Sequence, residues 1–388
     1  MSEIPASASV VVVGAGPTGL TAAVMLADAD IDVVVLDGLA EGANTSRAVA
    51  LHARTLEVLR ELGIADELHD RGLEVPRFTL RDGGHRLGTI SFAGLDTHYP
   101  YVLSLGQQIT ESVLLTRLRK AGGDVHRPYR VTAVRGDDTG VTVEYTDAAG
   151  GSGSIRADYV IGADGMHSVV RDQAGIGFTG DTYPESFVLA DVRMDWPDSR
   201  DQLTLQLSRE GITVIAPLPD ETPDRFRVVA TVDRAPEHPT LADIQAILDA
   251  RRPGARIREL LWSSRFRVHH RVAETYRAGR ILLAGDAAHV HSPAGGQGMN
   301  TGIQDAALLG TLLALVLGGE SPDLLDTYES RRRPIALGVV ALTDRMTTMA
   351  TLRSRPARTV RNAAIRLLTH IPAVRHRIAY QLSELSNH

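Results

Sequence analysis

The chain has 388 residues, a formal net charge of −6, no cysteine, and one lysine against 40 arginines. The lack of cysteine excludes disulfide frameworks, CxxC redox pairs, thiolate nucleophiles, zinc fingers and iron–sulfur clusters, and a single lysine restricts Schiff-base and P-loop chemistry. The length predicts two to three domains, and the mild acidity argues against binding to nucleic acid.

The first 40 residues predict a strand, a turn, a helix and a second strand. Val10–Val13 is a β-branched run typical of a strand buried on both faces, and Ile31–Leu36 repeats that pattern before Asp37. Later segments predict a helix over 56–62, short strands over 78–104, a helix over 111–118, a hairpin over 131–145, strands at 159–165, 187–194, 203–207, 212–216, 226–232 and 280–284, and a buried apolar helix over 306–317.

The turn after the first strand carries Gly14-x-Gly16-x-x-Gly19, which is the context in which this motif indicates a dinucleotide site. Gly14 permits the tight turn, Gly16 lets the backbone approach a pyrophosphate, and Gly19 lets the helix pack on the sheet. Asp37 would accept hydrogen bonds from ribose hydroxyls and disfavours a 2′-phosphate, so the site is expected to hold FAD or NAD. No second motif of this kind occurs, which predicts one firmly bound dinucleotide.

Two further strand ends carry an Asp beside a glycine, in the segments 161–165 and 283–289. Open α/β sheets bind ligands at such ends, although a lone Asp there is as often a helix cap. The segment Gly295–Asn300 precedes the apolar helix, so its backbone N–H groups would face a ligand and would stabilise negative charge on it. Pro293 would stiffen that wall.

Together these stretches resemble the class A flavoprotein monooxygenases, the para-hydroxybenzoate-hydroxylase-like group, and especially aromatic polyketide hydroxylases and tetracycline- or rifamycin-oxidising enzymes. The resemblance runs from residue 8 to about 335 and rests on Gly14–Gly19, Ser46–Ala48, Leu51–Thr55, Gln107, Thr110–Glu111, Asp164–Gly165, Gly285–Asp286 and Pro293–Asn300. It implies an α/β fold in which a Rossmann-like FAD-binding domain (1–75, 105–180 and 270–345) carries an inserted β-rich substrate domain (76–104 and 181–269) and a C-terminal helical tail (346–388).

The resemblance also implies roles for single residues. Asp286 would hold the ribityl chain, Asp164 would lie near the flavin and a visiting nicotinamide cofactor, and Arg47 would border the isoalloxazine and the hydride route. The candidate cofactor-binding residues are Gly14, Gly16, Pro17, Thr18, Gly19, Asp37, Arg47, Gln107, Asp164, Gly285, Asp286, Pro293, Gly296, Gly298, Met299 and Asn300. Arg47 and Pro293 are the candidate catalytic residues, and no general base is assigned.

The implied activity is an FAD-dependent NAD(P)H monooxygenase. FAD is bound tightly and non-covalently, NADPH or NADH reduces it transiently, and a flavin C4a-hydroperoxide transfers one oxygen atom from O2 to an aromatic substrate. A polyketide-like substrate of natural-product tailoring is favoured, with residues 78–104 and 187–216 as pocket walls. The alternatives are an antibiotic-inactivating monooxygenase, a membrane-associated reductase or quinone hydroxylase, and a non-catalytic flavin-binding module. A halogenase is disfavoured because the only lysine, Lys120, lies in a predicted helix.

The C-terminal tail is basic, with eight arginines and one acid over residues 345–388. Its apolar residues recur at helical spacing, and docking on the acidic body is favoured over a weak peripheral contact with anionic lipid. We find no export signal or membrane span, which predicts a cytoplasmic protein. The thioredoxin-like domain of many relatives does not follow, which is compatible with a monomer.

Other features receive an ordinary structural interpretation. No third ligand accompanies His289-x-His291, so no metal site is predicted. The pair His269-His270 is expected at the surface before a strand, and Arg331–Arg333 is expected to be a solvated charge run at a helix end. Trp196 and Trp262 fit either a substrate pocket or core packing.

Overall fold

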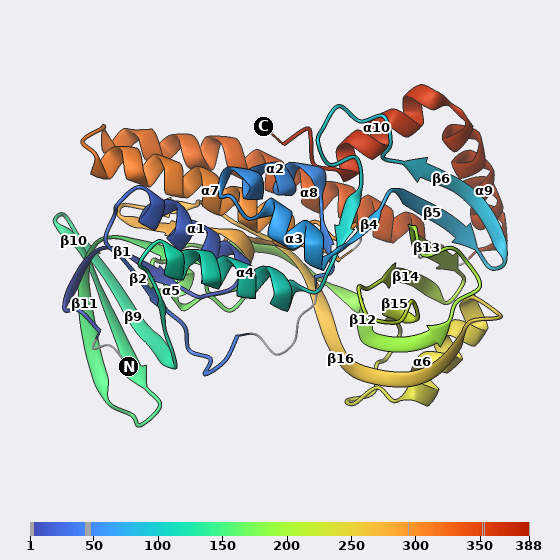
Figure 1. Cartoon of the computed structure of the whole chain (residues 1–388), viewed down its shortest axis with the longest axis horizontal. Helices are drawn as coiled ribbons and strands as arrows, with labels where there is room; N and C mark the ends of the chain where they lie inside the picture. The colour runs from blue at the N-terminus through green and yellow to red at the C-terminus, as the bar shows by residue number, and fades with distance from the viewer. Residues whose placement is uncertain (1–3, 43–47, 294, 351, 353, 388) are drawn as a thin grey trace.

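The computed structural model describes residues 4–42, 48–293, 295–350, 352 and 354–387. Within this part of the chain the strands form two eight-stranded sheets and one three-stranded sheet. Helices cover the first sheet, and the second sheet lies at the other end of the molecule beneath the C-terminal helices (Figure 1). The predicted α/β class, with a β-rich insertion and C-terminal helices, is confirmed.

The first sheet is built around β1, which pairs in parallel with β2 on one side and β11 on the other. Val10, Val11 and Val12 are fully buried, as a strand covered on both faces requires. The strands of this sheet are β1 (Ser7–Val13), β2 (Val33–Leu36), β8 (Val125–His126), β9 (Tyr129–Asp137), β10 (Gly140–Asp147), β11 (Ser152–Gly162), β17 (Arg277–Ala278) and β18 (Ile281–Leu283).

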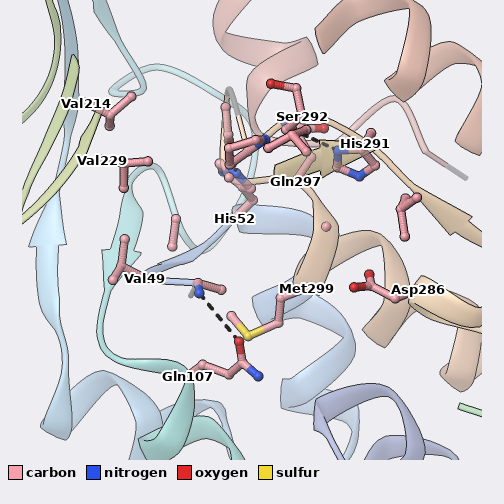
Figure 2. Close-up of a pocket in the computed structure, with 18 of the residues that line it drawn as sticks. Val49, His52, Gln107, Val214, Val229, Asp286, His291, Ser292, Gln297 and Met299 are labelled. Atoms are coloured by element: carbon pink, nitrogen blue, oxygen red, sulfur yellow. Dashed lines mark hydrogen bonds between the residues drawn. The ribbon is translucent and has the colours of Figure 1, made fainter. Parts of the chain in front are cut away.

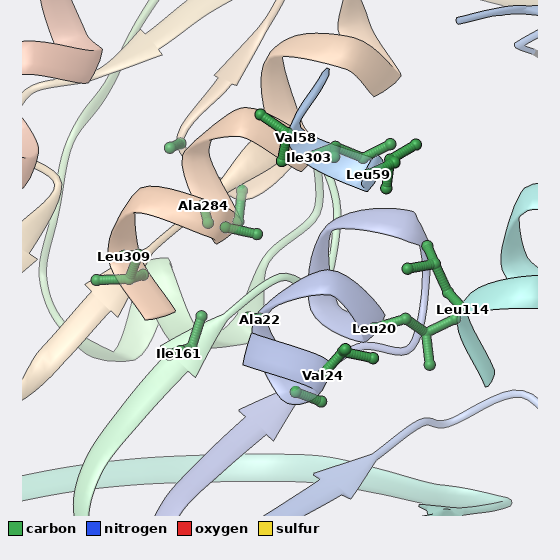
Figure 3. Packing of buried hydrophobic residues seen from close by; sticks show 14 of the residues in the cluster. Leu20, Ala22, Val24, Val58, Leu59, Leu114, Ile161, Ala284, Ile303 and Leu309 are labelled. Carbon is green, nitrogen blue, oxygen red and sulfur yellow. The ribbon is translucent and has the colours of Figure 1, made fainter. Parts of the chain in front are cut away.

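The helices on this sheet bury apolar faces against it and against one another. Leu20 and Val24 of α1, Leu114 of α4 and Leu309 of α7 belong to one buried cluster (Figure 3). The helices of this region are α1 (Pro17–Asp28), α2 (Ala53–Glu61), α3 (Ala65–Arg71), α4 (Gln107–Lys120), α5 (Val169–Gln173) and α7 (Gly298–Leu317). By length and composition α7 could cross a membrane, but 67% of its apolar window is buried inside the protein, so it is a core helix here.

The second sheet runs in the order β19-β16-β12-β15-β14-β13-β5-β6. Its strands are β5 (Arg77–Asp82), β6 (His85–Ser91), β12 (Phe178–Asp195), β13 (Gln202–Ser208), β14 (Gly211–Pro217), β15 (Arg225–Val232), β16 (Arg256–Ala273) and β19 (His289–Val290), and α6 (Leu241–Arg251) packs on it. The small sheet of β3 (Ala50–Leu51), β7 (Val102–Ser104) and β4 (Leu73–Val75) lies in the chain between strands of the two larger sheets.

The C-terminal helices α8 (Asp326–Ala350), α9 (Arg355–His370) and α10 (Pro372–Leu382) close the chain. Asp82 at the end of β5 accepts hydrogen bonds from Arg358 (2.8 Å), Arg361 (2.9 Å) and Asn362 (2.7 Å) of α9. The basic tail is therefore docked on an acid of the body. Its outer face leaves apolar side chains in solvent, and Val360 is 70% exposed.

Candidate functional site

The turn from β1 to α1 has the conformation that the glycine motif predicts. Gly14 has φ +101°, and a Cβ at Gly14 would lie 2.3 Å from the Ala163 carbonyl oxygen. A Cβ at Gly19 would lie 1.9 Å from the Gly14 carbonyl oxygen. At Gly16, by contrast, no protein atom lies within 4 Å of such a Cβ. Gly14 and Gly19 are thus required by the fold, whereas Gly16 faces open space at the N-terminus of a helix, where an anion binds well.

Asp37 follows β2 and lies against this turn. Its Oδ2 accepts hydrogen bonds from the Ala15 amide (3.1 Å) and from Arg127 (3.2 Å), and its Oδ1 accepts one from the Leu39 amide (2.9 Å). Arg127 also donates to the Ala15 carbonyl oxygen at 3.3 Å. These contacts together fix the carboxylate beside the glycine turn.

The two strand-end Asp residues are placed differently. The Asp164 carboxylate turns inward, where it accepts hydrogen bonds from the Ser168 hydroxyl (2.5 Å) and the Val170 amide (3.2 Å) at the start of α5. Burial raises its pKa, and these hydrogen bonds oppose that effect. Asp286, by contrast, is exposed and lines a cavity. Asp164 does not line this cavity, but its neighbours Ala163 and Gly165 do.

The glycine-rich segment before α7 forms one side of this cavity. Pro293, Gly295, Gly296, Gln297, Gly298 and Met299 all line it. Asn300 lies behind them and holds the segment in place: its amide nitrogen donates to the carbonyl oxygens of Ala50 and Gly296, both at 2.8 Å, and its oxygen accepts from the His52 amide at 2.8 Å. The N-terminus of a 20-residue helix is therefore aimed at the cavity.

The cavity has a volume of about 460 Å³ and joins the two sheets. It is lined by the predicted residues Gly16, Pro17, Thr18, Gln107, Asp286, Pro293, Gly296, Gly298 and Met299. The Gln107 side-chain oxygen accepts from the Ala48 amide at 3.4 Å, and its nitrogen donates to Glu111 at 2.8 Å. Figure 2 shows Gln107, Met299 and Asp286 on one side of the cavity and Val214 and Val229 on another. Arg47 and Ser46 lie outside the described residues.

The far wall comes from the second sheet and the segment before α4. It includes residues from both stretches in which walls are predicted: Phe78, Phe92, Val102, Leu189, Leu203, Leu205, Val214 and Ala216. The lining residues outside those stretches include Val229, residues 266–269 of β16, Met346 and Leu382. Leu382 ends α10, so the basic tail contributes to the cavity, which no pattern in the sequence indicates.

The sequence did not predict a buried ion network that lies behind the glycine-rich segment. Asp305 of α7 is fully buried, with Oδ1 2.6 Å from Arg332 Nε and Oδ2 2.5 Å from His289 Nε2. Oδ2 also accepts from the Gly285 amide at 3.2 Å. The expectation that Arg332 is solvated is wrong: α8 continues through Pro334, and this turns Arg332, 4% exposed, onto Asp305.

The structure also places the paired histidines and the two tryptophans. The pair His269-His270 lies inside β16, not before a strand, and His269 lines the cavity. Among the residues that the structure places, no group of three His, Cys, Asp or Glu could hold a metal ion. Trp196 packs on Phe226 in the buried cluster between the second sheet and α6, and Trp262 borders a different cavity beside Arg227.

The residues that follow α10 are held against α2 and α7. The Ser383 carbonyl oxygen accepts from the Arg54 amide (3.2 Å), and Glu384, fully buried, accepts from Gln304 at 2.5 Å. Burial raises the pKa of Glu384 from 4.5 to about 8, against the opposing effects of Arg332 and Gln304. The second Glu384 oxygen has no hydrogen-bond partner among the described residues. Burial therefore favours the protonated, uncharged form of the Glu384 carboxyl.

We expect this carboxyl to make the folded state less stable as the pH rises. The folded state holds a proton that the unfolded state releases above pH 4.5, so stability is full below that pH and is lost up to about pH 8. The expected slope is on the order of 1 kcal/mol per pH unit. Urea unfolding at pH 5, 7 and 9 measures it. Glu384→Gln should flatten the slope, whereas Glu320→Gln at an exposed site should not; equal slopes in all three proteins would contradict the assignment.

Comparison with known proteins shows the family of this chain. Residues 7–343 match the family described as FAD binding domain. The chain is 39% identical, over 85% of its length and 67% of the relative, to the 12-dehydrotetracycline 5-monooxygenase/anhydrotetracycline 6-monooxygenase of Streptomyces rimosus. It is 37% identical, over 85% of its length and 69% of the relative, to the rifampicin monooxygenase of Streptomyces venezuelae. It thus spans about two thirds of the length of these relatives.

A solved structure matches nearly end to end. The p-nitrophenol 4-monooxygenase PnpA from Pseudomonas putida DLL-E4 superimposes with a TM-score of 0.89 at 30% identity, with 99% of each chain covered. Because 99% of the present chain is covered, the match includes the C-terminal helices, which therefore belong to the shared fold.

Proposed function

Since this chain belongs to the FAD binding domain family, among FAD-dependent aromatic monooxygenases of the polyketide and antibiotic type, we propose that it consumes NADPH or NADH and O2 to hydroxylate a polycyclic, polyketide-like aromatic compound in natural-product tailoring. One observation carries the proposal. A single cavity runs from the open space at Gly16, past Asp286 and the N-terminus of α7, to the apolar face of the second sheet.

The residues present fit FAD. Gly16 leaves room at the N-terminus of α1 for a pyrophosphate, and Asp37 lies where ribose hydroxyls would be bound. Asp286 would bind the ribityl hydroxyls, and Gln107 would contact the ring system. When bound, FAD supplies electron transfer from the nicotinamide cofactor and oxygen activation at its C4a position.

The protein's own contribution is position, charge and the exclusion of water. The backbone N–H groups at the start of α7 would favour negative charge on a bound flavin, because they have no acceptor within the helix, and no acidic residue in the first turn opposes them. Pro293 would stiffen the wall beside the reacting atoms. The apolar strands of the second sheet would enclose the substrate and keep water from the reduced flavin. Arg47 is proposed, from the resemblance alone, to border the hydride route.

Purified protein should carry non-covalent FAD and consume O2 together with NADPH or NADH when a polycyclic phenol is added. Flavin absorbance, oxygen-electrode traces and mass spectrometry of the product measure the three parts of this expectation. A protein without FAD, or one whose NAD(P)H oxidation takes up no O2 with any aromatic compound, would rule the proposal out. FAD binding without oxygen uptake would identify a non-catalytic flavin-binding module.

Two lesser proposals accompany this one. The similarity to a rifampicin monooxygenase supports antibiotic inactivation as the second candidate role, which a rifamycin or tetracycline in the same oxygen assay distinguishes. We place the protein in the cytoplasm, as a monomer. The exposed apolar side chains of α9, such as Val360 and Leu367, lie among arginines and would allow weak contact with anionic lipid, which pelleting with anionic but not neutral vesicles would reveal.

A further inference from the structure

One part of the cavity wall, formed by four neighbouring strands of the second sheet, is apolar. Its side chains come from neighbouring strands of the second sheet, on β5, β13, β14 and β15: Phe78, Leu203, Leu205, Val214, Ala216 and Val229. Val214 and Val229 point into the cavity from the side opposite Gln107 and Asp286 (Figure 2). A ligand on this wall would therefore meet hydrocarbon and no hydrogen-bonding side chain.

Two histidines in the lining are held without charge. His52 Nε2 lies 2.9 Å from the Gly295 carbonyl oxygen, and His291 Nδ1 lies 3.0 Å from the Ser292 carbonyl oxygen. A carbonyl only accepts hydrogen bonds, so each of these nitrogens carries the proton and the other ring nitrogen is an acceptor. Burial lowers the pKa of both rings to about 4. Neither ring presents a positive charge near neutral pH.

Two further basic side chains line the cavity from β16, which is separated from the apolar wall by β12. Of the described lining residues only Arg267 and His269 are other basic groups, and the Arg267 side chain is exposed while His269 is bonded to Thr182. Arg227, on β15 near Val229, is 2% exposed but forms a buried ion pair with Asp191, at 2.6 Å, and does not line the cavity. The apolar wall therefore has no buried cation to offer among the residues that the structure describes.

From this wall we infer that the enzyme selects an uncharged aromatic substrate, one that lacks a carboxylate and is held by apolar contact. A carboxylate buried without a cation loses hydration that nothing replaces, which weakens its binding. Aromatic rings gain by burying their area on the same surface. The inference rests on the proposed function, because it takes this wall to be the substrate side of the cavity.

Three probes of similar size test the inference: 2-naphthol, methyl 6-hydroxy-2-naphthoate and 6-hydroxy-2-naphthoate. Each is titrated into the FAD-loaded enzyme while the flavin absorbance is recorded, so that binding is measured without turnover. The two uncharged probes should bind at least about tenfold more tightly than the acid. Equal or tighter binding of the acid, or no binding of either uncharged probe, would overturn the inference. Binding in the expected order without stimulated oxygen uptake would instead count against the proposed function alone.

A charge placed on the wall should reverse the order. Val214→Arg puts a cation beside the bound rings, and Val214→Gln is the control for size and polarity. The measured quantity is the binding affinity for the acid divided by the affinity for its methyl ester. This ratio should be at least about tenfold higher in Val214→Arg than in Val214→Gln. If Val214→Arg does not fold, Val229→Lys against Val229→Gln makes the same comparison from the next strand. An unchanged preference in a folded cationic variant would contradict a substrate site at this wall.

Discussion

Gly16→Val should yield a folded protein that no longer binds FAD. A side chain at Gly16 meets no protein atom within 4 Å, and the backbone there is extended, with φ −75° and ψ −178°, so the protein itself accommodates the change. The added atoms fill the space at the N-terminus of α1 that a pyrophosphate would occupy. We expect the flavin content of the purified protein to fall by more than about tenfold, equivalent to over 1.4 kcal/mol of binding free energy.

Two matched variants separate binding from folding. Gly338→Val, on the exposed face of α8 with open space around it, should keep both FAD and stability. Gly14→Ala should lose both, because its Cβ would collide with the Ala163 backbone and φ is +101°. Flavin absorbance and thermal unfolding by circular dichroism measure the two properties. A full complement of FAD in Gly16→Val would remove Gly16 from the cofactor site.

The glycine turn could be predicted because its requirements are local. A strand, a tight turn and a helix follow one another in the chain, the positive φ of Gly14 belongs to the turn itself, and Gly19 approaches Gly14 five residues earlier. The same holds for the hairpin of β9 and β10, in which Asp137 accepts hydrogen bonds from the amides of Thr139 and Gly140. Turns that depend on residues close together in the chain can be predicted from the sequence alone.

Two elements, α6 and β16, were not predicted although their sequences contain features that indicate them. The helix α6 begins with a capping box, in which Thr240 and Asp243 each bond the other's backbone amide, a pattern visible as Thr-x-x-Asp. The strand β16 spans 18 residues, but its alternation is interrupted where the register shifts against β12, near Asp191 and Arg193. Irregular pairing of that kind hides a long strand from a search for strict alternation.

The site residues that could not be predicted depend on contacts far along the chain. Arg332 looked like one of three surface arginines because its partner, Asp305, is 27 residues away on another helix. Leu382 reaches the cavity only because α10 docks against β6 and α7. Tertiary packing, and not local pattern, decides which charged or apolar side chain is buried.

The second large effect is expected at Asp305, whose loss should destabilise the fold by about 3–5 kcal/mol, because Arg332 would remain buried without its ion-pair partner. Burial alone would raise the pKa of Asp305, but Arg332 and His289 outweigh it and hold the pKa at about 2, so the ion pair persists across the neutral range. Asp305→Ala should also weaken FAD binding, because the Gly285 amide loses its acceptor just before Asp286. Urea unfolding and flavin titration measure the two effects.

A double substitution shows whether the cost comes from the orphaned charge. In Asp305→Ala with Arg332→Met both charges are gone, and the stability of the double variant should exceed that of Asp305→Ala by about 1–3 kcal/mol. The FAD affinity should recover less, since the Gly285 amide still lacks its acceptor. Additive losses in the double variant would mean that Asp305 and Arg332 act independently, and the 2.6 Å contact between them would then contribute little to the fold.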